Sequence, residues 1–185
     1  MNILGIIASS KFGDVGDFES IATTTLSTAT ASVTFSSISA TYAHLQLRMF
    51  VRATVFNHPL LLRFNNDSGA TNYDFHRLNG NGTSAGADAR INFSAIYISS
   101  RGYGISSTAN IGSAVVVDIL DYTNTNKNKT TRILSGQELN TSNSDIEFTS
   151  GSWKNTSAIN RIDLSMGSGD LAQYTHIALY GIRSA

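Results

Sequence analysis

Residues 42–53 read YAHLQLRMFVRA and alternate strictly between two kinds of side chain. Every second residue is apolar, from Ala43 to Ala53, and most of the residues between them are polar or charged. A period of two is typical of a β-strand with one buried and one exposed face. The stretch YTHIALYGI, residues 174–182, repeats the pattern Y-x-H-[LI]-x-L. The two stretches therefore predict two strands of similar design, each with a polar side whose role has to be found.

The rest of the chain carries the same signature of short strands separated by turns. No window of eleven or more residues shows the apolar spacing of an amphipathic helix. Separators such as NNDSGAT and NTNKNK are rich in residues that favour turns. The expected strands cover residues 19–26, 31–38, 42–53, 59–66, 72–79, 91–98, 112–122, 129–136, 144–151, 159–166 and 174–182. This pattern predicts an all-β protein, a single jelly-roll-like antiparallel β-sandwich.

Two segments differ from this strand pattern. Residues 1–18 predict an extended N-terminal arm, and residues 19–185 predict the sandwich domain. The apolar run in the arm, Ile3–Ala8, lacks a basic flank and is too short for a signal peptide or a membrane span. We therefore expect synthesis in the cytoplasm. The Gly-rich stretch GNGTSAGADA, residues 80–89, predicts a loop at one end of the sandwich.

Residues 112–122 predict a central strand. Three valines follow one another at Val115–Val117, and such continuous apolar character favours a strand covered on both faces. The next expected strand follows after TNTNKNK, so the two strands predict a hairpin with Lys127 and Lys129 at its tip.

Composition excludes several classes of function. The chain has 185 residues, enough for one domain with a core, and its 13 basic side chains balance 13 acidic ones. Because nucleic-acid binding usually shows as an excess of basic residues, we expect no nucleic-acid partner. The absence of cysteine removes disulfides, thiolate zinc sites and cysteine nucleophiles together.

Neither catalytic nor metal-binding residues form a recognisable motif. The chain lacks a Walker A sequence, and no serine lies in a sequence context that marks a nucleophile. Asp118 and Asp121 are three residues apart on an expected strand, so they point to opposite faces. His44 and His176 hold equivalent places in the two Y-x-H strands, which leaves both a shared metal site and ordinary hydrogen bonding open. NNDSGATNYD, residues 65–74, gathers oxygen ligands but breaks the calcium-loop spacing. We expect no enzyme activity, cofactor or metal.

Several ordered blocks carry a resemblance that extends from about Gly16 to Ile182. They read GDFESIATTTL, ASVTFSSISATYAHLQLR, LLLRFNNDSGATNYDFHRL, VVVDILDYTNTNKNKTTRIL, GSWKNTSAINRIDL and YTHIALYGI. In these blocks the chain resembles a family of virion proteins from tailed bacteriophages of aquatic and marine bacteria. The resemblance implies a structural protein of the outer virion surface that is made in the cytoplasm of the bacterial host.

Two places on the particle fit this resemblance. On the head, the protein would be a capsid decoration (cement) protein, commonly a homo-trimer, bound to the major capsid protein or other virion proteins. On the tail, it would be a fibre or receptor-binding tip that recognises host surface glycans. The short single domain, the zero net charge and the arm favour the head. Neither place involves a membrane partner.

Each alternative implies a set of contact residues. For the head we expect an interface formed by the arm and by the polar side of residues 42–53. Its residues are Ile3, Leu4, Ile6, Ile7, Phe12, Arg48, Phe50 and Arg52. For the tail, a glycan contact would use Tyr103, Trp153, Lys154 and Asn155, although a single tryptophan in a sandwich is more often buried.

Overall fold

The computed structural model describes residues 17–99, 105–139 and 144–183, and strands account for all the regular structure in these ranges. In chain order the strands are β1 (Phe18–Thr25), β2 (Ser32–Phe35), β3 (His44–Val51), β4 (Leu60–Phe64), β5 (Tyr73–Gly80), β6 (Ala85–Phe93), β7 (Ile96–Tyr97), β8 (Ser113–Leu120), β9 (Lys129–Gln137), β10 (Asp145–Trp153), β11 (Ile162–Met166) and β12 (His176–Ile182).

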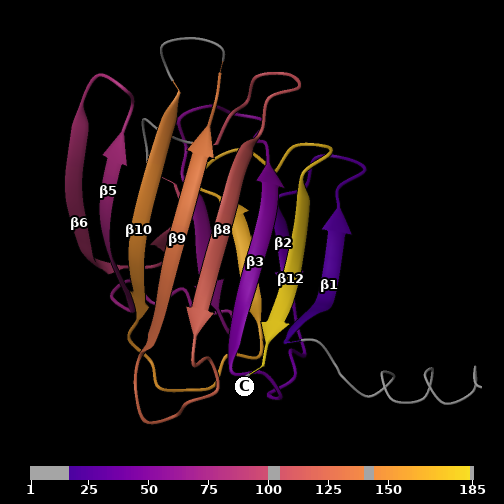
Figure 1. Ribbon diagram of the computed structural model, residues 1–185, viewed down its shortest axis with the longest axis vertical. Helices are drawn as coiled ribbons and strands as arrows, with labels where there is room; N and C mark the ends of the chain where they lie inside the picture. Colours follow the sequence, from indigo (N-terminus) through magenta and orange to yellow (C-terminus); the bar gives the residue numbers. More distant parts are fainter. Residues whose placement is uncertain (1–16, 100–104, 140–143, 184–185) are drawn as a thin grey trace, which may run out of the picture.

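Two antiparallel sheets pack against each other and form a β-sandwich, as predicted (Figure 1). The large sheet has eight strands in the order β1-β12-β3-β8-β9-β10-β5-β6, and the small sheet has four in the order β2-β11-β4-β7. A jelly roll distributes eight strands over two Greek keys. The observed division into eight and four strands does not confirm that finer prediction.

The apolar side of residues 42–53 faces the core between the sheets. Leu45, Leu47 and Val51 on β3 are fully buried, as the alternation predicted. The small sheet supplies the opposite wall, for example with Leu62 on β4 and Leu164 on β11. Burying such side chains contributes about 2 kcal/mol each, which makes this layer the main source of stability.

The two strands with the repeated Y-x-H pattern are neighbours in the large sheet. They run antiparallel, so that His176 lies opposite Phe50, and His44 lies opposite Ile182. The histidines therefore sit at opposite ends of the strand pair. The antiparallel direction excludes the shared metal site that equivalent positions had left open.

The predicted loop at residues 80–89 is wrong. Gly80 ends β5, and residues from Ala85 onward form β6, so only a short turn remains between them. Asn81 explains the turn, because its side-chain Oδ1 accepts hydrogen bonds from the backbone N–H of Thr83 (3.0 Å) and Ser84 (2.8 Å). The segment is thus a β-hairpin at the edge of the large sheet.

The predicted strand at residues 91–98 is interrupted. Its first part belongs to β6 in the large sheet and its second part is β7 in the small sheet. Asn92 has a φ of 60°, a left-handed conformation that asparagine tolerates better than most residues. This backbone turn lets the chain pass from one sheet to the other.

The predicted hairpin of β8 and β9 is confirmed, but only one of the two lysines expected at its tip is exposed there. Lys127 is half exposed and pairs with Asp121. Lys129 is fully buried, and its ammonium donates to the carbonyl oxygens of Asn124 (2.6 Å), Lys127 (3.1 Å) and Thr156 (2.9 Å). It holds the turn together from inside.

The expected arm falls almost entirely outside the described residues, which begin just before β1. In the described part of the chain, no helix has the length and apolarity needed to cross a membrane.

Candidate interaction surface

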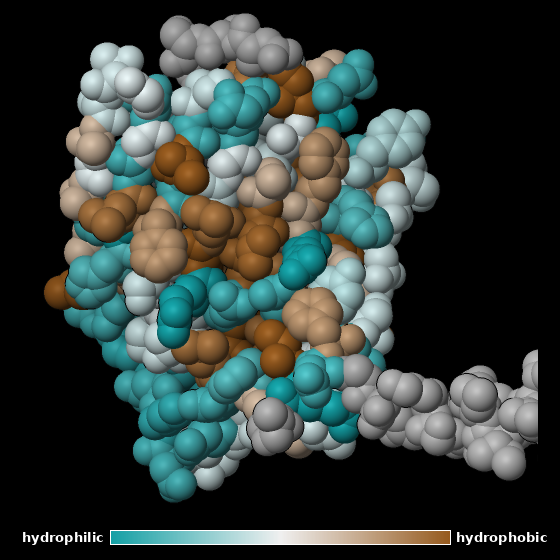
Figure 2. Space-filling model, viewed as in Figure 1, coloured by the Kyte–Doolittle hydropathy of each residue, from teal (hydrophilic) through white to brown (hydrophobic). Residues whose placement is uncertain are grey.

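The outer face of the large sheet carries a contiguous group of apolar side chains. Because side chains alternate along a strand, each strand that buries one row presents the other row to solvent. We call the central exposed group the outer patch: Phe50, Leu78, Ala114, Val116, Leu134, Ile146 and Phe148. Figure 2 shows apolar side chains gathered near the middle of this face.

Strand register brings the members of the outer patch together from five strands. One row across the sheet joins Phe50, Ala114, Gly136 and Ile146. The next row joins Val116, Leu134, Phe148 and Leu78. The largest side chains remain substantially exposed, with Leu78 at 59%, Ile146 at 56% and Leu134 at 49%. Monomeric proteins seldom leave a contiguous apolar area of this kind open, so it indicates a contact surface.

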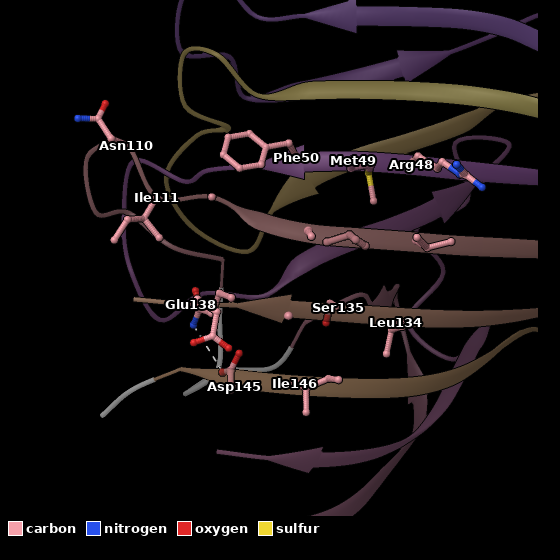
Figure 3. A pocket seen from close by; sticks show the side chains of 16 residues that line it. Arg48, Met49, Phe50, Asn110, Ile111, Leu134, Ser135, Glu138, Asp145 and Ile146 are labelled. Atoms are coloured by element: carbon pink, nitrogen blue, oxygen red, sulfur yellow. Dashed lines mark hydrogen bonds between the residues drawn. The ribbon is translucent and has the colours of Figure 1, made fainter. Parts of the chain in front are cut away.

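A hollow of about 830 Å³ lies within the outer patch. Ala114 and Gly136 have small or no side chains and form its floor, whereas Phe50 and Ile146 rise on its two sides (Figure 3). The Phe50 ring is held in place against Gly112, where an added Cβ would come within 2.3 Å of the ring. The hollow is therefore a preformed feature of the sheet surface.

A second hollow of about 510 Å³ lies beside the first, toward the edge strand β6. Leu78 and Phe148 border it on one side, and Ala87 and Ala89 of β6 border it on the other. The outer patch thus combines protruding side chains with two depressions, which is the relief that a protein partner can match.

Charged groups surround the outer patch and differ in how they are engaged. Arg48 donates to Gln46 Oε1 (2.8 Å), and its guanidinium lies over the Phe18 ring, 5.1 Å from the centroid. Arg132 and Glu138 are exposed near the two ends of β9. Among the described residues neither of them has an ion-pair partner. These two charges are available to a partner.

The residues expected at an interface are only partly on this surface. Arg48 and Phe50 lie on the outer face of β3, where both are exposed. Arg52 lies just beyond the strand, is half-buried and donates from Nε to the Thr108 carbonyl (3.2 Å). The remaining expected interface residues lie outside the described residues: Ile3, Leu4, Ile6, Ile7 and Phe12.

Three of the residues expected at a glycan contact are described by the structure, and these three do not form an exposed platform. Trp153 is buried between Phe64 and Tyr73, and its indole N–H donates to Asp67 Oδ2 (2.7 Å), so its ring is inaccessible to a sugar. Lys154 is bound to Asp74 (2.9 Å) and Asn92 (2.7 Å). Asn155 accepts a hydrogen bond from the backbone N–H of Ser157 (2.8 Å). Tyr103 lies outside the described residues.

The oxygen-rich stretch at residues 65–74 contains a carboxylate that other contacts occupy. The Asp67 carboxylate in NNDSGATNYD accepts hydrogen bonds from Gly69, Asn72 and Trp153. Burial opposes its ionisation, but these hydrogen bonds outweigh burial and lower its pKa. The described residues contain no cluster of three or more histidine, aspartate or glutamate side chains that could bind a metal ion.

Asp118 joins two neighbouring strands of the large sheet. Its Oδ1 accepts a hydrogen bond from Gln46 Nε2 (2.7 Å) on the outer face of the large sheet. Asp121 lies beyond the end of β8 and contacts Lys127 and His44. The two carboxylates are thus engaged separately, but Asp121 lies in the turn after β8 and not on the strand that the prediction assumed.

The sequence interpretation missed most of the outer patch. Leu134, Ile146 and Phe148 lie in strands that were predicted, but their faces were not assigned. A signal was present in the alternation of β9, where Arg132 and Leu134 share one face and Ile133 occupies the other. The neighbours of each strand were not deducible, so the patch could not be assembled.

Comparison with known proteins adds no identification. The chain matches no protein-family model, and a search of curated proteins finds no match either.

Proposed function

We propose that this protein is a structural component of a tailed-phage virion that works by adhesion, as a decoration protein bound to the outside of the capsid. A rigid sandwich presents the outer patch to another protein, and burial of apolar side chains holds the two together. Repetition over an icosahedral surface multiplies weak contacts, so avidity supplies a hold that one interface lacks.

The observation that carries this proposal is the outer patch itself. Its five largest side chains, among them Leu134 and Ile146, are between 45% and 59% exposed and come from four strands, with β8 completing the patch between β3 and β9. Covering each such side chain contributes of the order of 1 kcal/mol, because about half of its surface is already buried. A surface of this kind is suited to protein contact and poorly suited to binding a small polar substrate.

The resemblance to phage virion proteins supports the placement on a particle. The tail alternative requires a glycan platform, and buried Trp153 does not provide one. We therefore favour the head, with the major capsid protein or other virion proteins as partners.

Gold-labelled antibody against the protein tests this proposal on phage particles that carry it. We expect label over the head, and we expect particles that lack the protein to release DNA at a lower temperature. Adding back wild-type protein should restore heat resistance, whereas Leu134→Asp should restore less. Label confined to the tail would contradict the head placement, and equal heat resistance without the protein would contradict reinforcement.

A further inference from the structure

We propose that the outer patch binds a second copy of this chain, face to face, about a two-fold axis that crosses the strands above Ser135. This inference rests on the proposed function in one respect: it names a second copy, in place of another virion protein, as the occupant of the outer patch, so that the dimer would contact the capsid through its remaining surfaces.

The axis follows from the strand register. Met49, Val115, Ser135 and Glu147 form one row across β3, β8, β9 and β10, with their side chains turned inward. Consider a two-fold axis that runs parallel to this row, just above the outer face of the sheet. It places each strand of one copy over the same strand of the other copy, and the two strands run in opposite directions. Residues equally far before and after the row then face each other. Sheets stack face to face in this way at about 10 Å.

On β8 and β9 this arrangement pairs large side chains with small ones, whereas on β10 it places Ile146 against Phe148. On β9, Leu134 of one copy faces Gly136 of the other, and the reverse contact is made at the same time. On β8, Val116 faces Ala114 in the same reciprocal way. Because Ala114 and Gly136 form the floor of the larger hollow, the two protruding side chains enter it. The outer patch is thus complementary to its own two-fold image.

Charge is complementary under the same operation. Arg132 lies three residues before Ser135 and Glu138 lies three residues after it, both on the outward side and both exposed. The axis brings Arg132 of each copy against Glu138 of the other. Neither side chain has an ion-pair partner among the residues that the structure describes. The dimer gives two ion pairs to groups that the single chain leaves unpaired.

The other facing pairs set no like charges against each other, and on β3 Arg48 faces the Phe50 ring. Gln46 on β3 faces Arg52, and Asp118 on β8 faces Gly112. Ser150 on β10 faces Ser144, which directly precedes the strand. A one-strand shift or a parallel arrangement would lose the pairing of Arg132 with Glu138. Charge therefore selects one arrangement, while the apolar contacts supply most of the attraction.

A charge reversal with rescue tests this arrangement on the full chain. Wild-type protein should sediment as a dimer, with twice the 19.8 kDa mass of one chain. Arg132→Glu and Glu138→Arg alone should each weaken the dimer about tenfold or more, because each sets like charges against each other. The double variant should return toward wild-type affinity. Six residues of β-strand separate the two positions by about 20 Å, so rescue within one chain is excluded.

Ile91→Glu is the matched control, because Ile91 is 65% exposed on edge strand β6 and borders neither hollow. It should leave the dimer intact. Circular dichroism and fluorescence of buried Trp153 should confirm that each variant is folded. A wild-type monomer or trimer, single reversals without effect, or a double variant no better than the singles would each overturn the proposal. A dimer absent from phage heads would instead overturn only the proposed function.

Discussion

Lys129 has no exposed surface, yet its ammonium is fully used. The three carbonyl oxygens that it contacts belong to the turn before β9 and to the loop after β10. Burial, and then the nearby charge of Lys127, lowers the pKa of Lys129. Three hydrogen bonds to a charged donor offset the cost of burying it. The residue therefore ties two loops together at one end of the sandwich.

Replacing Lys129 with methionine keeps the apolar stem but removes the donor. Three carbonyl groups then lose a partner, and we expect the free energy of unfolding to fall by about 3 kcal/mol. Lys127→Met in the same turn is the control, since it removes only the surface pair with Asp121 and should cost less than about 1 kcal/mol. Urea denaturation followed by Trp153 fluorescence measures both. Equal losses would show that the three carbonyl contacts do not stabilise the fold.

The two lysines illustrate what the sequence could predict at this scale. The turn chemistry of TNTNKNK predicted the hairpin correctly. The position of Lys129 depends on alternation, because it shares a face with Thr131 and Ile133, both of which are buried. That rule could have placed it inside. The carbonyl groups that make burial tolerable include one from Thr156, which is brought near only by the fold.

On strand β10 the acidic side chains face the core and the apolar side chains face solvent, which is the reverse of the usual arrangement. Asp145 and Glu147 point inward and are buried, whereas Ile146 and Phe148 point outward and are exposed. Read alone, this alternation predicts the opposite orientation, with the apolar pair inside. The face of β10 that carries Asp145 and Glu147 also carries Trp153, a core residue. Burial of Trp153 therefore determines which face of the strand points inward. The reversed strand is what gives the outer patch two of its largest members.

The acidic residues on this strand predict a pH dependence. Burial and the charge of Glu147 raise the pKa of Asp145 to about 7. The folded protein therefore binds a proton that the unfolded chain releases at a lower pH, near the ordinary value of 3.8. Stability from this group is present at low pH and is lost as the pH rises from about 4 to about 7. Asp145→Asn should flatten this decline in urea denaturation series.

Asp170→Asn is the control for this series, because it removes one acid from the loop after β11, away from β10. Its profile should keep the decline seen in the wild type. A wild-type stability that is constant from pH 5 to pH 7.5, the interval expected to span most of the titration, would show that Asp145 is not held in its neutral form.

At the scale of the whole molecule, strand order determines the surface. The sequence predicted an all-β sandwich and nearly every strand, because alternation and turn residues act locally. The sequence also predicted that both faces of β8 are buried. In the single chain, Val116 on the outer face of β8 is only half-buried. A second copy over the outer patch would supply that cover. The patch itself escaped prediction because five strands, distant in sequence, contribute to it.

Association through the outer patch makes stability depend on concentration. Only folded chains pair, so raising the protein concentration shifts the equilibrium toward the folded dimer and raises the urea midpoint. We expect a steady rise over about a hundredfold range of concentration, followed by Trp153 fluorescence. Leu134→Asp places a charge between the large sheets of the two copies and prevents them from pairing, so the urea midpoint of this variant should be independent of concentration. Ile91→Asp adds the same charge outside the patch and should keep the rise. A wild-type midpoint that does not move with concentration would contradict pairing of the folded chains.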